Sequence, residues 1–381
     1  MRARIVSLAL TLFASAAHAQ SDNALTNAPA DFTPQIKELY RVAACGPTDA
    51  VPARFNAKEV DAHCQTLAEH IDRYKTRWLD KAKPVLATVV PAGLPDKLVY
   101  PFGGGDLVTA LATFPHASEI TTVSLEISGD ARKIDTIPPA KLAGALKTIA
   151  ENIRRLFAVA HSKTTNLTII SKADLPGQLI FALVALAVHD MEPVSLKYFR
   201  LAPDGAIQYV TNADIAAAKD AKAQAALFLN MEIAFRKKGD AAAPVRIYRH
   251  ISANLDDKHL AADPSVIKHL EAKGKVAAMT KAASFLLWYK DFTTIREYLL
   301  KNMEWMISDA TGILPHVAKA AGFEQITYGR FDGPFLPAGK TDGAEMKKLW
   351  ADEPAQPLDF RYGYPDSAHH SHMMVTRRAK P

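Results

Sequence analysis

The chain of 381 residues is 49% hydrophobic and 23% charged, and it contains 18 Gly, 23 Pro and only 2 Cys. These fractions describe a folded globular protein and exclude a disordered chain, a collagen and a small disulfide-stapled domain. The formal net charge is +6, carried by small scattered groups of basic residues without interleaved aromatic residues. Nucleic acid is therefore not an expected partner.

Residues 1–19 have the three parts of a secretory signal peptide. Arg2 and Arg4 form a basic start, an apolar run follows over residues 5–17, and alanines stand at the two positions where signal peptidase requires small residues. An N-terminal anchor helix is the alternative, but the apolar run is too short to span a bilayer. We expect cleavage before Gln20 and a mature protein that is periplasmic or secreted, without stable membrane insertion.

Cys45 and Cys64 are the two cysteines of the chain. In an oxidising compartment an even pair most simply forms one disulfide bond. A metal site is the alternative, but the spacing lacks the C-x-x-C pairs of most zinc sites. We therefore predict a Cys45–Cys64 disulfide.

The N-terminal part of the mature chain is expected to be helical. Residues 20–34 are polar, contain two prolines and resemble a flexible leader. Within residues 35–92, helices are predicted over 36–44 and 57–82, the second with apolar residues at helical spacing on one face. An α/β domain is expected over residues 93–381.

This α/β domain begins with a pattern typical of a Rossmann-like fold. An apolar strand over residues 98–102 is followed by the glycine turn Gly103-Gly104-Gly105-Asp106, a helix over 107–114 and a second strand over 120–127 that contains Glu126. Further elements are predicted in chain order: helices 142–161 and 176–188; strands 166–171, 194–201, 206–210, 231–236 and 245–251; helices 266–289 and 292–308; strand 373–376. We expect a Rossmann-like core with a mixed sheet flanked by helices, plus the helical N-terminal segment.

Six stretches from residue 97 onward resemble, in the same order, a family of exported bacterial α/β proteins without an established activity. They are YPFGGGD (100–106), VSLEISG (123–129), KAASFLLWYKDFTTIREYLL (281–300), SDATGILP (308–315), YGRFDGPF (328–335) and FRYGYPD (360–366). The chain departs from the family pattern in its triple glycine and in Glu126-Ile127, where the family has Ser-Gly-Pro and Glu-Pro. The resemblance implies an α/β architecture rather than a particular chemistry.

The glycine turn at Gly103, Gly104, Gly105 and Asp106 is the first candidate ligand site. Glycines after a strand let a ligand approach the backbone, and Glu126 or Asp130 could accept hydrogen bonds from a ribose. This is the layout used for S-adenosylmethionine or dinucleotides, although the spacing is not G-x-G-x-x-G. The favoured alternative is a structural turn in which Asp106 caps the following helix. The cofactor is therefore left unassigned.

A histidine cluster over residues 369–372 is the second candidate. In an extended segment His370 and His372 would point to one side and could chelate zinc or copper with a third ligand from Asp366, Asp332 or His316. A polar loop that leads into the last strand is the favoured alternative.

Two aromatic loops, residues 328–334 and 360–366, each combine an Arg and an Asp, as sugar- or peptide-binding loops do. Packing over a sheet edge is the favoured alternative. Arg330 in the first loop, and Asp309 near a helix end, are the remaining candidates for ligand binding.

The motifs G-x-S-x-G, H-E-x-x-H, S-x-x-K and a Walker loop do not occur in the sequence. The leading hypothesis is an exported protein that binds a small molecule or a protein partner without recognisable catalysis. The alternative is an enzyme with a methyltransferase-like or hydrolase site at residues 103–106 and Glu126.

Overall fold

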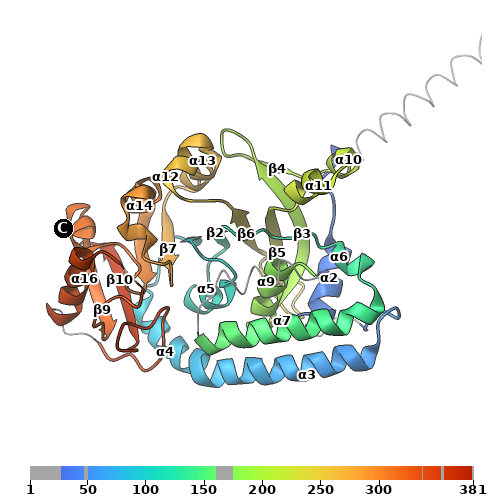
Figure 1. The fold of residues 1–381 in the computed structure, drawn as a ribbon, viewed down its shortest axis with the longest axis horizontal. Helices are drawn as coiled ribbons and strands as arrows, with labels where there is room; N and C mark the ends of the chain where they lie inside the picture. The colour runs from blue at the N-terminus through green and yellow to red at the C-terminus, as the bar shows by residue number, and fades with distance from the viewer. Residues whose placement is uncertain (1–26, 47–49, 160–174, 337, 353–355, 380–381) are drawn as a thin grey trace, which may run out of the picture.

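The computed structural model describes residues 27–46, 50–159, 175–336, 338–352 and 356–379 (Figure 1). The predicted signal peptide and the predicted strand over residues 166–171 lie outside this part of the chain. No helix within it has the length and apolar character that crossing a bilayer requires.

One ten-stranded mixed sheet forms the centre of the fold, in the order β4-β3-β5-β6-β2-β1-β7-β8-β10-β9. Its strands are β1 (Lys97–Pro101), β2 (Glu119–Ser124), β3 (Met191–Leu201), β4 (Ile207–Tyr209), β5 (Asn230–Lys237), β6 (Arg246–Ser252), β7 (Val276–Thr280), β8 (Met303–Ser308), β9 (Phe323–Gly329) and β10 (His372–Arg378). The five central strands β6, β2, β1, β7 and β8 are parallel to one another. Strand β5 is antiparallel to β6, and β10 is antiparallel to both β8 and β9.

Helices cover both faces of the sheet because the central strands are apolar on both sides. On β1, Leu98 and Tyr100 face one core cluster and Val99 faces another. The first cluster is covered by α2 (Thr33–Val42), α3 (Ala57–Tyr74), α4 (Asp80–Val89), α5 (Leu107–Thr113), α7 (Pro139–Val159) and α9 (Gly177–Val188). The second is covered by α12 (Asp257–Ala262), α13 (Ser265–Glu271), α14 (Thr293–Asn302) and α15 (Pro315–Ala320). Figure 1 shows α3 and α7 side by side along one face and α12 to α14 beyond the opposite face.

Short elements complete the chain: the π-helical turn η1 (Lys75–Leu79), helices α6 (Lys133–Thr136), α10 (Asn212–Ala217), α11 (Ala221–Leu227) and α16 (Lys340–Asp352), and the 3₁₀ turns η2 (Leu286–Trp288) and η3 (Lys290–Phe292). Residues 57–82 are helical as predicted, but the π-helical turn η1 interrupts the α-helical pattern between α3 and α4, and α4 continues to Val89. Ala30 and Phe32, ahead of α2, are buried in the core.

The predicted disulfide between Cys45 and Cys64 is confirmed. It joins the segment after α2 to the middle of α3, and its Cα atoms are 5.4 Å apart. The bridge thus fixes two N-terminal helices against each other beside the sheet.

The strand, glycine turn, helix and strand at the start of the α/β domain are confirmed as β1, α5 and β2. The strands predicted over residues 194–201 and 206–210 are confirmed as the antiparallel pair β3 and β4. The two predicted helices over residues 266–289 and 292–308 are wrong. The first consists of α13, the central strand β7 and the turn η2, and the second of α14 followed by β8. Alanine and methionine favour helices in isolation, but here the interior of a parallel sheet imposes the strand conformation.

Candidate functional site

A cavity of about 800 Å³ opens at the carboxyl ends of four parallel strands. The residues that follow β1, β2, β6 and β7 line it, together with the C-terminal loop: Phe102, Gly104, Ser124 to Glu126, Ala253 to Asp256, Lys281 to Ser284, Leu286, Phe292, Phe335, Leu336, Arg361, Tyr364, Pro365 and His369. Strand β1 lies between β2 and β7, so the strand order reverses at β1, with β2 and β6 on one side and β7 and β8 on the other. In open α/β sheets this switch point is where ligands bind.

The three glycines of the turn have different surroundings. Gly104 lines the cavity with a left-handed φ of 48°. At Gly103 a Cβ atom would lie 2.9 Å from both the ring and the carbonyl oxygen of Tyr100, so only glycine fits the packing there. Gly105 is buried and is not a lining residue. The turn therefore brings one glycine, rather than three, to the cavity.

Asp106 is at the N-cap position of α5 but makes no side-chain capping bond, which corrects the capping interpretation. Its carboxylate instead pairs with Lys281 Nζ at 2.7 Å and accepts hydrogen bonds from Tyr100 Oη at 2.9 Å and Thr109 Oγ1 at 2.7 Å. The side chains of Asp106 and Lys281 are 2% and 1% exposed. This ion pair lies directly beneath the cavity, whose lining includes Lys281.

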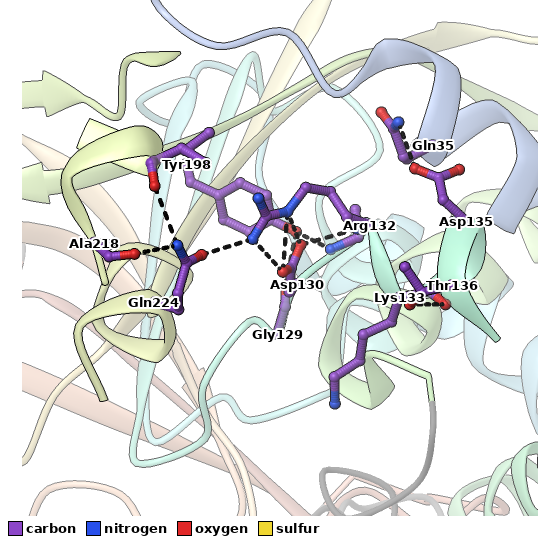
Figure 2. Close-up of polar contacts among 12 residues, drawn as sticks. Gln35, Gly129, Asp130, Arg132, Lys133, Asp135, Thr136, Tyr198, Ala218 and Gln224 are labelled. Carbon is purple, nitrogen blue, oxygen red and sulfur yellow. Dashed lines mark hydrogen bonds and ion pairs between the residues drawn. The ribbon is translucent and has the colours of Figure 1, made fainter. Parts of the chain in front are cut away.

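Of the two acids considered for a ribose contact, only Glu126 lines the cavity. Asp130 is engaged elsewhere, because Arg132 binds both of its carboxylate oxygens and also donates to Gln224 (Figure 2). Tyr198 completes this second cluster by donating to the carbonyl of Gly129. Glu126 is left partly exposed at the end of β2, with its carboxylate available to a ligand.

A buried polar network fixes the backbone on both sides of this site. His250 Nε2 donates to the carbonyl of Glu126 at 2.7 Å, since a carbonyl can only accept. Its Nδ1 is then the acceptor for Thr122 Oγ1 at 3.0 Å. Gln178 Nε2 donates to the carbonyl of Gly104 at 2.9 Å. Burial lowers the pKa of His250, so the neutral imidazole holds Glu126 in place. Neither His250 nor Gln178 belongs to a sequence motif, and sequence reasoning missed both.

Asp309 is fully buried behind the cavity wall rather than facing a ligand. Its carboxylate accepts hydrogen bonds from the backbone of Ala282, Thr311 and Tyr364 and thereby joins the loop after β7 to the C-terminal loop. Arg330 is outside the lining, 70% exposed and paired with Asp332. The structure therefore brings Glu126 and Gly104 to one cavity, with Asp309 as support and Arg330 elsewhere.

Four non-glycine residues of the cavity wall have left-handed backbone conformations. They are Phe102 at φ 61°, Ala282 at 54°, Ser284 at 51° and His369 at 65°. Such conformations cost about 1–3 kcal/mol each and cluster at functional sites. Seven non-glycine residues in the described part of the chain have positive φ, so more than half surround this cavity.

The histidine cluster does not assemble as the H-x-H spacing suggests. His370 Nδ1 lies 2.9 Å from Asp366 and 3.3 Å from Asp332, and these three residues form a group with metal-ligand geometry among the described residues. His372 instead packs against the rings of Phe331 and Trp350. His316 pairs with Glu345.

Asp366 is already saturated by protein donors. It accepts from the backbone N–H groups of Asp332, Ala368 and His370 as well as from the His370 ring. These hydrogen bonds explain the cluster as one that holds the C-terminal loop in place, in agreement with the favoured alternative of a polar loop that leads into the last strand.

Some residues of the two aromatic loops are packed in the core, and others line the cavity. Phe331 belongs to a core cluster with Trp350, and Phe360 and Tyr362 are buried in the main core, whereas Tyr364 and Arg361 reach the cavity.

Comparisons of the chain with protein-family models, with curated proteins and with solved structures found no match.

Proposed function

We propose that this protein binds a small molecule with a nucleoside-like part in the cavity at the carboxyl ends of β1, β2, β6 and β7. The observation that carries the proposal is the placement of Glu126 and Gly104 on two neighbouring strand ends of one cavity at the switch point of the sheet. The Glu126 carboxylate would accept hydrogen bonds from vicinal hydroxyl groups, and Gly104 would let a ligand approach the backbone.

The remaining wall suits a flat apolar group. Phe102 and Phe292 are in edge contact with ring centroids 5.8 Å apart, and Leu255 and Leu286 also line the cavity. A volume of about 800 Å³ is within the range of cavities that enclose a drug-sized ligand. An anionic group at the start of α5 is not part of the proposal, because the Asp106 carboxylate occupies that position.

The test is native mass spectrometry of the purified protein for a co-purified ligand, followed by calorimetric titration with adenosine. We expect binding that Glu126→Gln weakens about tenfold, the effect of losing a charged hydrogen-bond acceptor. Glu297→Gln, an exposed acid on α14 outside the lining, is the matched control and should bind as the wild type does. Absence of adenosine binding, or equal weakening by both variants, would contradict the proposal.

A methyltransferase-like enzyme is the second candidate, and the sheet order favours it. Counted along the chain, the parallel strands follow the 3-2-1-4-5 order of a doubly wound nucleotide-binding sheet, and the antiparallel strand β10 is inserted between β8 and β9. S-adenosylmethionine contains a nucleoside, which a sheet of this order can bind at its switch point. Titration with S-adenosylmethionine separates the candidates, because the enzyme requires this donor to bind at least as tightly as adenosine.

We also propose that the protein is exported and loses residues 1–19. The Cys45–Cys64 disulfide supports this, since such bonds persist in oxidising compartments. Mass spectrometry of protein from fractionated cells should find an N-terminus at Gln20 in the periplasm or the medium. A full-length cytoplasmic product with free thiols would refute export.

A further inference from the structure

A second cavity, of about 430 Å³, lies between α3 with η1 on one side and α7 on the other. We define it as the arginine pocket by its lining residues: His70, Arg73, Tyr74, Arg77, Trp78, Arg154, Phe157, Ala158, Arg361 and Ser371. It shares Arg361 with the cavity at the carboxyl ends of β1, β2, β6 and β7, called the strand-end cavity below. Ser371 directly precedes β10, and the other lining residues belong to α3, η1 and α7.

Helical spacing creates the pocket. The lining residues of α3 and η1 are three or four positions apart along residues 70–78, and so are those of α7 along residues 154–158. Residues at this spacing lie on one face of a helix, so each helix contributes one face to the pocket. Arg77 and Trp78 are in the π-helical turn, an element that occurs frequently at functional sites.

The lining carries four guanidinium groups and no carboxylate. Within the part of the chain that the structure describes, Arg77, Arg154 and Arg361 have no ion-pair partner, and Arg73 meets only Glu69 at 3.7 Å. That pair is 61% and 67% exposed, and such surface pairs contribute little. Burial, followed by the charges of Arg73 and Arg154, lowers the pKa of His70. The pocket is therefore a region of uncompensated positive charge.

An aromatic stack holds the pocket floor in place. Phe157, Tyr74 and Trp78 stack successively, with ring centroids 4.4 Å and 5.4 Å apart. Trp78 Nε1 donates to the carbonyl of Arg361 at 2.6 Å and so joins the floor to the C-terminal loop. The cationic groups are thus placed around a base of stacked aromatic rings.

We propose that the arginine pocket binds a small multivalent oxyanion, a molecule with two or more phosphate or carboxylate groups. The planar guanidinium group pairs with either anion through two parallel hydrogen bonds, and several such groups around one pocket favour a ligand with more than one negative charge. The proposal is independent of the nucleoside-like ligand of the strand-end cavity.

The test is calorimetric titration of the disulfide-bonded protein with pyrophosphate and, separately, with citrate. We expect at least one of them to bind, with Arg77→Ala and Arg154→Ala each weakening that anion about tenfold or more. Arg155→Ala is the matched control, because Arg155 is the exposed neighbour of Arg154 on α7 and is not a lining residue. The stronger of the two anions assigns phosphate or carboxylate as the ligand chemistry.

Two results would overturn the proposal: no binding of either anion, or equal weakening by all three arginine variants, which would indicate attraction to the general surface charge. Arg77 and Arg154 are exposed residues, so circular dichroism of their variants should match the wild type. Glu126→Gln should leave anion binding unchanged, which separates this site from the one proposed at the strand ends.

Discussion

Breaking the buried pair of Asp106 and Lys281 should destabilise the protein strongly. Both side chains are at most 2% exposed, and Nζ lies 2.7 Å from Oδ2. Removing one partner leaves the other charge in the core without its counterion, a change that costs about 3–5 kcal/mol. Asp106→Asn and Lys281→Met, which nearly preserve side-chain shape, should each lower the free energy of unfolding by about this amount.

The double variant provides the critical comparison. With both charges removed, no unpaired ion remains, and the loss should be no larger than that of one single variant rather than the sum of the two. Urea unfolding followed by far-UV circular dichroism measures all three variants, with a constant dependence on urea as evidence of an unchanged two-state transition. Single-variant losses that simply add would refute the view that the two charges depend on each other.

Three further predictions concern the rest of the fold. Partial burial of Glu119 opposes its ionisation, but Lys273 and Arg249 hold its pKa at about 2. Its stabilising contribution should therefore be complete above the ordinary value of 4.5 and disappear as the pH falls towards 2. Thermal melts should show a weaker pH dependence between 5 and 3 for Glu119→Gln than for the wild type. Reduction of the Cys45–Cys64 disulfide, which closes a loop with a sequence separation of 19, should lower the free energy of unfolding by about 3 kcal/mol. Urea titrations with and without reductant measure this difference, and an unchanged midpoint would contradict it. If His370 only holds the C-terminal loop in place, elemental analysis should find the same zinc and copper content in wild type and His370→Ala, and metal that only the wild type retains would argue for a metal site.

The opening α/β unit could be predicted from the sequence because each of its signals is local. A short apolar run, a glycine turn and a helical pattern lie within residues 98–127 and agree with one another. The strands β7 and β8 could not be predicted in the same way. Their runs VAAMT and MEWMIS are rich in residues that favour helices, and only their position in the interior of the mixed sheet makes them strands.

The site shows the same division between local and long-range information. Gly104 and Glu126 follow strands that the sequence pattern predicts, so the pattern also predicts that both residues lie at one site. His250 and Gln178 act through the backbone carbonyls of residues more than 70 positions away, and nothing near them in the sequence marks that role. The sequence places Asp309 near the end of a predicted helix, whereas in the structure it directly follows strand β8 and bonds to a turn.

The left-handed residues around the strand-end cavity have a consequence for the stability of the chain. Glycine would adopt these conformations without strain, yet Phe102, Ala282, Ser284 and His369 occupy them. Each of them costs about 1–3 kcal/mol of a small margin of stability. With four such residues in one wall, the shape of this cavity lowers the free energy of unfolding of the whole chain.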